Sequence, residues 1–236
     1  MNIEVKDLTI RYGNRTVLDH INHIFEERKI HVILGPNGCG KTTLVNYLVN
    51  NAEQRDKLTY VQQETVGELD MTAGDVVKLG RYHKKGFYQV FTNEDMIKVN
   101  EAVSMMDAED VINQNYDTLS GGEKQRIQIA RAIAKDYDWL ICDEPTANLD
   151  IKHQVGFAGI VKKLKAQGKS VIVIIHDINL ALNIADEVLM MKEGRILYSG
   201  KASDVICEKN LKDVFETDFI RIENTDTKTN NFIYNV

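Results

Sequence analysis

The sequence of 236 residues contains only two prolines, one tryptophan and three cysteines. Cys39, Cys142 and Cys207 are far apart and lack CxxC spacing, so they indicate neither a disulfide framework nor a structural zinc site. No stretch approaches the roughly 20 apolar residues of a membrane-spanning helix, and the start, MNIEVKDLTIRYG, lacks the apolar core of a secretory signal. We therefore expect a cytosolic chain that reaches a membrane only by docking.

The charge balance is acidic, with 29 Lys and Arg against 35 Asp and Glu and a net charge of −6. Such a chain lacks the overall positive field on which non-specific nucleic-acid binding depends, so no nucleic-acid partner is expected. With 43% hydrophobic and 27% charged residues, the composition is typical of globular proteins and excludes a disordered or low-complexity chain.

Short apolar runs alternate with helical patterns along the chain. Runs at 31–34, 139–142 and 171–175 are each followed by a polar turn and a helical stretch. Continuous apolar strands that alternate with helices predict an α/β fold with a mostly parallel sheet covered on both faces. Residues 2–10 and 17–25 instead alternate partially between apolar and polar positions, which predicts an antiparallel strand pair.

From residue 72 to 135 the pattern indicates helices alone. Thr72 and Asp75 form a predicted capping box, Asn93 is a predicted cap of a second helix, and Ser120 with Glu123 forms another box.

This change of pattern predicts the organisation of the chain. We expect one domain over 1–236, with a sheet core from 1–65 and 136–200, a helical lobe inserted at about 66–135, and a C-terminal extension at 201–236. An EG turn after residue 186 predicts a hairpin, and the last 36 or so residues predict short helices and a final strand or two.

Residues 35–43 read GPNGCGKTT and match the phosphate-loop pattern G-x-x-x-x-G-K-[ST] between a strand and a helix. Glycines let backbone N–H groups approach a polyphosphate, and the helix directs its positive end at the same anion. Lys41 is expected to reach the β and γ phosphates, Thr42 to ligate Mg²⁺, and Thr43 to lie near the α phosphate. The predicted nucleotide-binding residues of this loop are Gly35, Pro36, Asn37, Gly38, Cys39, Gly40, Lys41, Thr42 and Thr43.

Cys39 has two interpretations. A thiol at a helix N-terminus beside Lys41 is expected to have a lowered pKa and to react readily. Alternatively, it is a small residue tolerated in a tight loop.

Residues 139–144, WLICDE, form an apolar strand that ends in two carboxylates. Such an end is expected to face solvent, a cation or a reacting group. We interpret Asp143 as the Mg²⁺ partner of Thr42, and Glu144 as the catalytic base that orients and deprotonates a water molecule. The alternative is a solvated strand end without a role in catalysis.

The segment 119–126 reads LSGGEKQR. Helix capping alone explains its serine and glutamate, but glycine at the first two helical positions costs about 1 kcal/mol each. Close approach of the backbone to another phosphate explains that cost.

The motifs GPNGCGKTT, LSGGEKQR, WLICDEPTANLD and IIHD occur in this order over residues 35–177. Together they resemble the ATP-binding-cassette (ABC) ATPases, over nearly the whole chain. The resemblance implies a P-loop NTPase core, ATP and Mg²⁺ as cofactors, and a head-to-tail homodimer in which Ser120, Gly121 and Gly122 contact the nucleotide of the other copy.

The resemblance also implies roles for four further residues. Tyr12 matches the aromatic residue that stacks on adenine, and Gln63 matches the glutamine that contacts Mg²⁺ and the attacking water. Asp150 matches an aspartate at the dimer seam, and His176 matches the histidine that holds the γ phosphate. The catalytic set is therefore Glu144, His176, Gln63 and Lys41, and the metal set is Thr42, Gln63 and Asp143.

From Tyr60 the chain reads YVQQETVGELDMTAGDVVKLGRYHKKG, which resembles importers of ferric siderophores, haem and cobalamin. It departs from their pattern at Gln62, where they usually have proline. The resemblance implies a motor at the cytoplasmic face of the membrane that docks on a permease through a groove between lobe and sheet, and that serves a substrate-binding protein indirectly.

Three alternatives stay open at this point. The chain could be an ABC ATPase of another transporter branch, a soluble ABC ATPase of the kind used in iron–sulfur assembly, or a nucleotide sensor without hydrolysis. The sensor predicts loss of Glu144 or Lys41, and both are present. The sequence gives no functional role to His20, His23, His31, His83 and His153.

Overall fold

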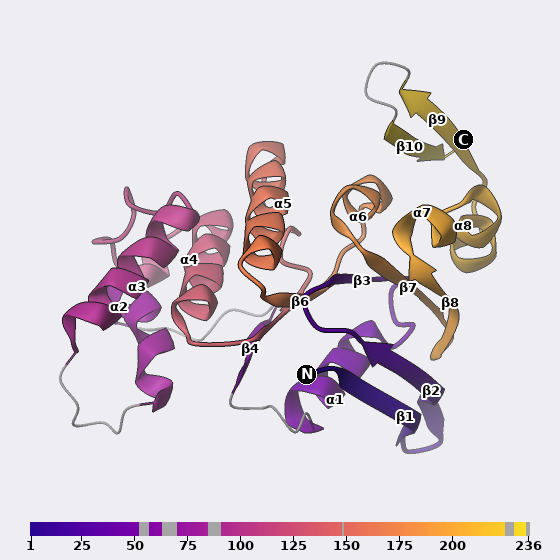
Figure 1. Ribbon diagram of the computed structural model, residues 1–236, viewed down its shortest axis with the longest axis horizontal. Helices are drawn as coiled ribbons and strands as arrows, with labels where there is room; N and C mark the ends of the chain where they lie inside the picture. The colour runs from indigo at the N-terminus through magenta and orange to yellow at the C-terminus, as the bar shows by residue number, and fades with distance from the viewer. Residues whose placement is uncertain (52–56, 63–69, 85–90, 148, 225–228, 235–236) are drawn as a thin grey trace.

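A computed structural model describes residues 1–51, 57–62, 70–84, 91–147, 149–224 and 229–234. Its centre is a six-stranded sheet in which β8 alone runs antiparallel to its neighbour (Figure 1). The strand order is β4 (Leu58–Val61), β5 (Trp139–Asp143), β6 (Ser170–Ile174), β3 (Ile30–Leu34), β7 (Glu187–Lys192) and β8 (Arg195–Lys201). The mostly parallel α/β sheet predicted from the sequence is confirmed.

The three central strands β3, β5 and β6 are buried at every residue, as their continuous apolar runs predict. Alternate side chains enter two separate cores: Val32 packs in one and Ile33 in the other. Helices α5 (Ile151–Ala166) and α6 (Ile178–Ile184) cover the first face, and helix α1 (Lys41–Asn51) covers the second (Figure 1).

The predicted antiparallel pair is confirmed as β1 (Ile3–Tyr12) and β2 (Arg15–Phe25), which form a sheet of their own. In Figure 1 this sheet lies on the same side of the central sheet as α1. Its apolar side chains, Phe25 among them, share a core with Ile33 and Trp139 of the central sheet.

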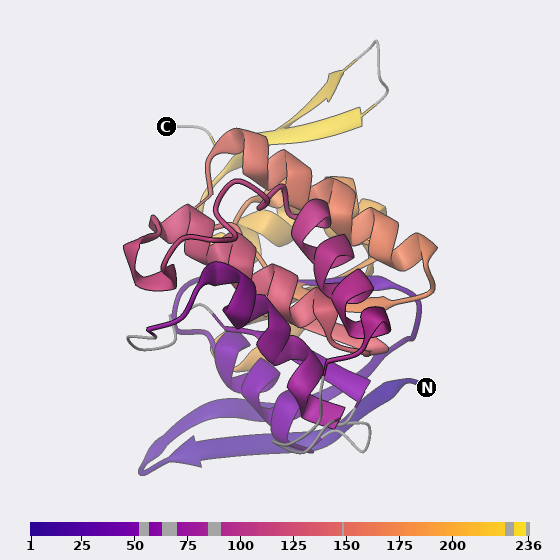
Figure 2. The same cartoon turned by 90° about the vertical axis from the view of Figure 1, so that its left-hand side faces the viewer.

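Between β4 and β5 the described chain is helical, and its helices pack together (Figure 2). They are the α-helices α2 (Ala73–Lys78), α3 (Asn93–Met105) and α4 (Gly121–Ala134), and the 3₁₀-helices η2 (Leu79–Lys84) and η3 (Tyr116–Thr118). The predicted domain boundaries themselves stay a prediction.

The predicted cap of α3 at Asn93 is wrong by one residue. Thr92 has an extended backbone, its hydroxyl accepts from the Asp95 N–H, and the Asp95 carboxylate accepts from the Thr92 N–H. Thr92 rather than Asn93 caps the helix because Asp95, three residues after Thr92, completes a reciprocal capping box with it. The box between Ser120 and Glu123 is confirmed.

The C-terminal part contains α7 (Ala202–Val205), α8 (Glu208–Phe215) and a hairpin of β9 (Phe219–Asn224) and β10 (Thr229–Tyr234). The Asn179 side chain fixes this hairpin to α6: its amide donates to the Phe232 carbonyl at 3.1 Å and accepts from the Phe232 N–H at 2.7 Å. None of the helices in the described ranges has the length and apolarity to cross a membrane.

A buried ion pair joins the helices that follow β4. The Arg81 guanidinium donates to Asp95 Oδ1 at 3.0 Å and to the Ala134 carbonyl at 3.0 Å, and the two charged side chains are 12% and 3% exposed. The pair therefore connects η2, α3 and the end of α4.

Replacing Asp95 with alanine should lower the free energy of unfolding by about 3 kcal/mol or more, because the Arg81 charge would stay buried without its carboxylate and the capping box with Thr92 would be lost. Chemical denaturation monitored by circular dichroism measures this change. The matched control is Glu94→Ala at the exposed neighbouring position, with an expected loss below about 1 kcal/mol. Equal losses in the two variants would contradict a stabilising role for the pair.

Candidate functional site

The loop between β3 and α1 has a backbone that only glycine can supply. Gly35 and Gly40 have φ values of 153° and 107°. A Cβ at Gly35 would lie 2.3 Å from the Met191 carbonyl oxygen, and one at Gly40 would lie 2.8 Å from the Val17 carbonyl oxygen. The two glycines therefore allow the loop to press against β7 and β2.

Lys41, the first residue of α1, is folded back into this loop. Its Nζ donates to the Gly35 carbonyl at 2.8 Å and to the Pro36 carbonyl at 3.0 Å, and the residue is only 5% exposed. Burial would be costly for an ammonium group without these acceptors. The result is a fixed positive charge at the N-terminus of a helix, where anions are bound favourably.

A cavity of about 340 Å³ opens beside the loop. Tyr12, predicted as an aromatic contact, stands at it with 65% of its surface exposed. Arg15 and Val17 of β2 also line the cavity. Neither was predicted from the sequence, because only the tertiary packing of β2 brings them to the cavity. The loop and sheet residues that complete the lining are Asn37, Gly38, Gly40, Lys41, Thr42, Thr43 and Glu144.

Asp143 is the last residue of β5 and is only 2% exposed. Burial raises the pKa of its carboxyl, while a hydrogen bond with the Thr42 side chain acts in the opposite direction. Its Oδ1 has no hydrogen-bond partner among the described residues. A buried carboxylate oxygen beside a hydroxyl is a donor set suited to a hard divalent cation such as Mg²⁺.

Glu144 and His176 are in contact, as Glu144 Oε1 lies 2.7 Å from His176 Nε2. They follow the ends of the neighbouring strands β5 and β6, whose carboxyl ends meet at one edge of the sheet. Glu144 also lines the loop cavity. The structure therefore brings four predicted residues, Lys41, Asp143, Glu144 and His176, to the same edge.

The structure does not bring the LSGG segment into this cavity. Ser120 and Gly121 are exposed at the start of α4, where the Ser120 hydroxyl donates to Glu123 Oε2 at 2.6 Å. Asp150 is exposed at the start of α5 and accepts from the His153 N–H at 2.9 Å. Ser120, Gly121, Gly122 and Asp150 are all outside the described lining of the cavity. Their contact with the nucleotide of a second copy stays a prediction.

The expected lowered pKa of Cys39 is wrong. The residue is 4% exposed, and burial raises the pKa of its thiol despite the opposing effects of Lys41 and the backbone N–H groups. The second interpretation, a small residue in a tight loop, fits this environment. Gln63, predicted to contact the metal and the attacking water, lies outside the described residues.

Residues 18–147 match the ABC transporter family. The chain is 31% identical to the petrobactin import ATP-binding protein YclP of Bacillus subtilis, over 91% of this chain and 92% of that protein. It is 29% identical to the hemin import ATP-binding protein HmuV of Bartonella henselae, over 90% of each.

Solved structures agree with the fold. A transporter described as of the metal-chelate ABC type, in an inward-facing conformation, has a chain that superposes with a TM-score of 0.88 at 23% identity, over 99% of this chain and 97% of that one. The ATP-binding cassette MJ0796, in a dimeric state with ADP and phosphate, superposes with a TM-score of 0.73 at 27% identity, over 86% of this chain and 99% of that one.

Proposed function

Because the chain belongs to the ABC transporter family, we propose that it is the ATP-hydrolysing subunit of an importer for an iron-siderophore, haem or cobalamin. The observation that carries the proposal is the cavity at the carboxyl edge of the sheet, where a buried lysine, a buried carboxylate and the Glu144–His176 pair converge. The similarity to petrobactin and hemin import proteins supports the class of cargo.

In this function, the loop N–H groups and Lys41 bind the phosphates of ATP, and the exposed ring of Tyr12 stacks on the adenine. Arg15, at the same cavity, adds a positive charge for the polyphosphate. Thr42 and Asp143 would hold Mg²⁺, and the contact of Gln63 with the ion stays a prediction. The ion would neutralise phosphate charge, and Asp143 Oδ1, buried without a described partner, fits that role.

Glu144 is the group that orients and deprotonates the attacking water. It lines the cavity with 18% of its side chain exposed, so it can meet both solvent and nucleotide. His176, at 2.7 Å, fixes the position of the carboxylate and is available to the γ phosphate.

Replacing Glu144 with glutamine should lower the rate of ATP hydrolysis by about 10² to 10⁴-fold, because the amide cannot accept the proton of the water. ATP affinity should stay near that of the wild type. Phosphate release and nucleotide binding measure the two effects, with Glu101→Gln on the exposed face of α3 as the control. Turnover near the wild-type level would show that Glu144 is not the base.

The proposal also includes a head-to-tail homodimer. Ser120, Gly121 and Asp150 present polar groups and backbone to solvent rather than to their own cavity. Beside Asp150, Ile151 and Val155 are 79% and 67% exposed, and they lie four residues apart on one face of α5. An exposed apolar pair next to a capping aspartate is consistent with a surface that a second copy covers.

Ser120→Arg in the Glu144→Gln background should abolish ATP-dependent dimerisation, because a long cation would occupy the corner that receives the phosphate of the other copy. Light scattering with and without ATP measures the dimer, and each monomer should still bind ATP. The matched control is Ser203→Arg, at an exposed serine of α7. Dimer formation by Ser120→Arg would refute the shared site.

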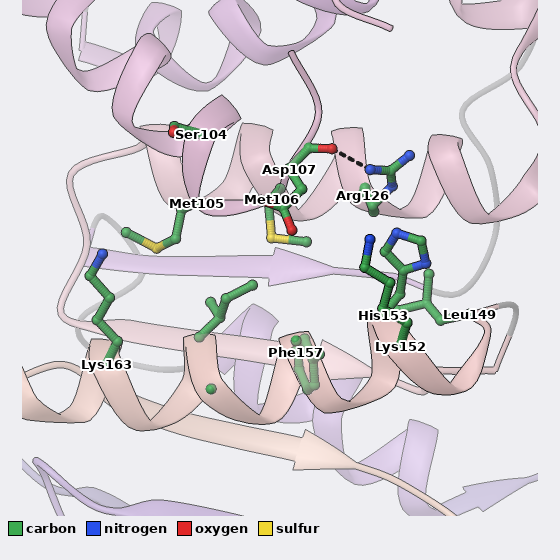
Figure 3. Close-up of a pocket in the computed structure, with 13 residues that line it drawn as sticks. Ser104, Met105, Met106, Asp107, Arg126, Leu149, Lys152, His153, Phe157 and Lys163 are labelled. Carbon is green, nitrogen blue, oxygen red and sulfur yellow. Dashed lines mark hydrogen bonds between the residues drawn. The ribbon is translucent and has the colours of Figure 1, made fainter. Parts of the chain in front are cut away.

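A groove of about 310 Å³ between α3, α4 and α5 is the proposed docking site for the permease (Figure 3). Met105, Met106 and Phe157 supply apolar side chains, while Lys152 and Lys163 supply positive charge. An apolar permease helix with acidic flanks fits this lining. Since the permease spans the membrane, docking would place the chain at its cytoplasmic face, with the substrate-binding protein contacted only through the permease.

Two glycines in α5 support a partner in this groove. Gly156 and Gly159 each cost about 1 kcal/mol of helix propensity relative to alanine. A Cβ at either position would meet no atom within 4 Å, so packing within the chain gives no reason for glycine. Space for an incoming permease helix would give such a reason for glycine at these positions.

Gly159→Leu should reduce co-purification with the permease from detergent-solubilised membranes by at least tenfold, because its side chain would fill part of the groove. ATP hydrolysis by the isolated chain should remain. Lys162→Leu, on the same helix but outside the groove lining, is the matched control and should co-purify normally. Equal co-purification of both variants would place the permease elsewhere.

A further inference from the structure

Three side chains that the ATP site does not use converge at the opposite end of the central strands. His23 lies on β2, His31 is the second residue of β3, and Glu187 is the first residue of β7. His31 and Glu187 are directly paired across the parallel strands. One ligand atom from each of the three residues lies within 4.8 Å of the other two.

His31 is fully buried, and its tautomer follows from one contact. Its Nε2 lies 2.8 Å from the Glu26 carbonyl oxygen, which can only accept, so Nε2 carries the proton. Burial lowers the pKa of His31, which keeps the ring neutral. Nδ1 is then an unprotonated nitrogen, with no hydrogen-bond partner among the described residues, and it faces Glu187 Oε2 at 3.6 Å.

This arrangement is the one that histidine adopts when it binds a metal. A ligating imidazole usually donates its second N–H to a backbone carbonyl or carboxylate, which fixes the ring and directs the other nitrogen at the ion. The Glu26 carbonyl does this for His31. Packing against Phe25 and Trp139, at ring-centroid distances of 5.3 and 6.2 Å, fixes the ring further.

His23 provides a second such nitrogen. Its Nε2 is buried and has no described hydrogen-bond partner. Burial lowers the pKa of His23 to about 4, so the ring is neutral at physiological pH and can donate a lone pair. Two buried imidazole nitrogens without partners in one cluster are costly unless something binds them.

Glu187 supplies the negative charge. Lys29 Nζ donates to its Oε1 at 2.6 Å and holds the carboxylate in place, and Lys29 is also paired with Glu26 at 2.7 Å. Lys29 therefore forms ion pairs with both Glu26 and Glu187. The second carboxylate oxygen of Glu187, Oε2, faces His31.

We propose that His23, His31 and Glu187 form a binding site for a divalent transition metal of the zinc class. Zinc takes nitrogen and oxygen ligands at about 2.1 Å, so its ligand atoms lie at most about 4.2 Å apart. The three ligand atoms lie within 4.8 Å of one another, so metal binding would require the partly buried His23 side chain to move slightly toward the other two. His23 and Glu187 are only partly buried, which leaves the fourth position to water. Bound metal would link the β1–β2 sheet to the strand that carries the phosphate loop.

The test is calorimetric titration of the metal-free full-length protein with Zn²⁺, supported by the visible spectrum of Co²⁺ in the same site. The wild type should bind one equivalent, and Zn²⁺ should raise its melting temperature. His23→Asn and Glu187→Gln should each weaken binding by at least tenfold. The matched control is His20→Asn, at an exposed histidine of the same strand, which should bind as the wild type does.

These two variants avoid His31, whose replacement would disturb the core. Circular dichroism in the presence of a chelator must show that both are folded as the wild type is. Absence of one-equivalent Zn²⁺ binding by the wild type would overturn the proposal, as would binding that survives both substitutions. Loss of binding in His176→Asn instead would assign the ion to the Glu144–His176 pair and equally overturn it.

Discussion

The proposed ATP site depends on one buried cation and the loop that holds it. Lys41 keeps its charge inside the protein because the carbonyls of Gly35 and Pro36 accept hydrogen bonds from its ammonium group. Those carbonyls are in place because Gly35 and Gly40 adopt positive φ against the backbone of neighbouring strands. The loop is thus held by contacts with the strands beside it, and an anion could bind there without a large rearrangement of the chain.

Strand order decides which side chains join that cation. Because β5 and β6 are parallel neighbours, Asp143, Glu144 and His176 emerge at one edge, although 32 residues separate Glu144 from His176. Asp143 faces inward to Thr42, and Glu144 faces the cavity. One edge therefore holds a buried carboxylate and a partly exposed one, and the proposed function assigns the first to a cation and the second to a water molecule.

Much of this could be predicted from local sequence. The buried strand around Val32 and the Ser120 capping box depend on neighbours in the chain, and both are confirmed. The misplaced cap at Asn93 is a local error of one residue, whereas the other missed or wrong predictions depend on distant contacts. Arg15 reaches the cavity through sheet packing, and burial raises the pKa of Cys39 against its local charges. The proposed metal-binding role of His31 likewise depends on tertiary structure, because it requires β2, β3 and β7 to bring His23, His31 and Glu187 together.

The tie between Asn179 and Phe232 has a consequence for the end of the chain. Asn179 follows His176 by three residues, and both of its amide atoms are engaged by one backbone unit of β10. A truncation that removes this hairpin would therefore remove one of the contacts at the start of α6, the helix that follows His176, and leave the Asp177 cap in place. The last strand of the described chain is thus coupled directly to the segment that carries His176.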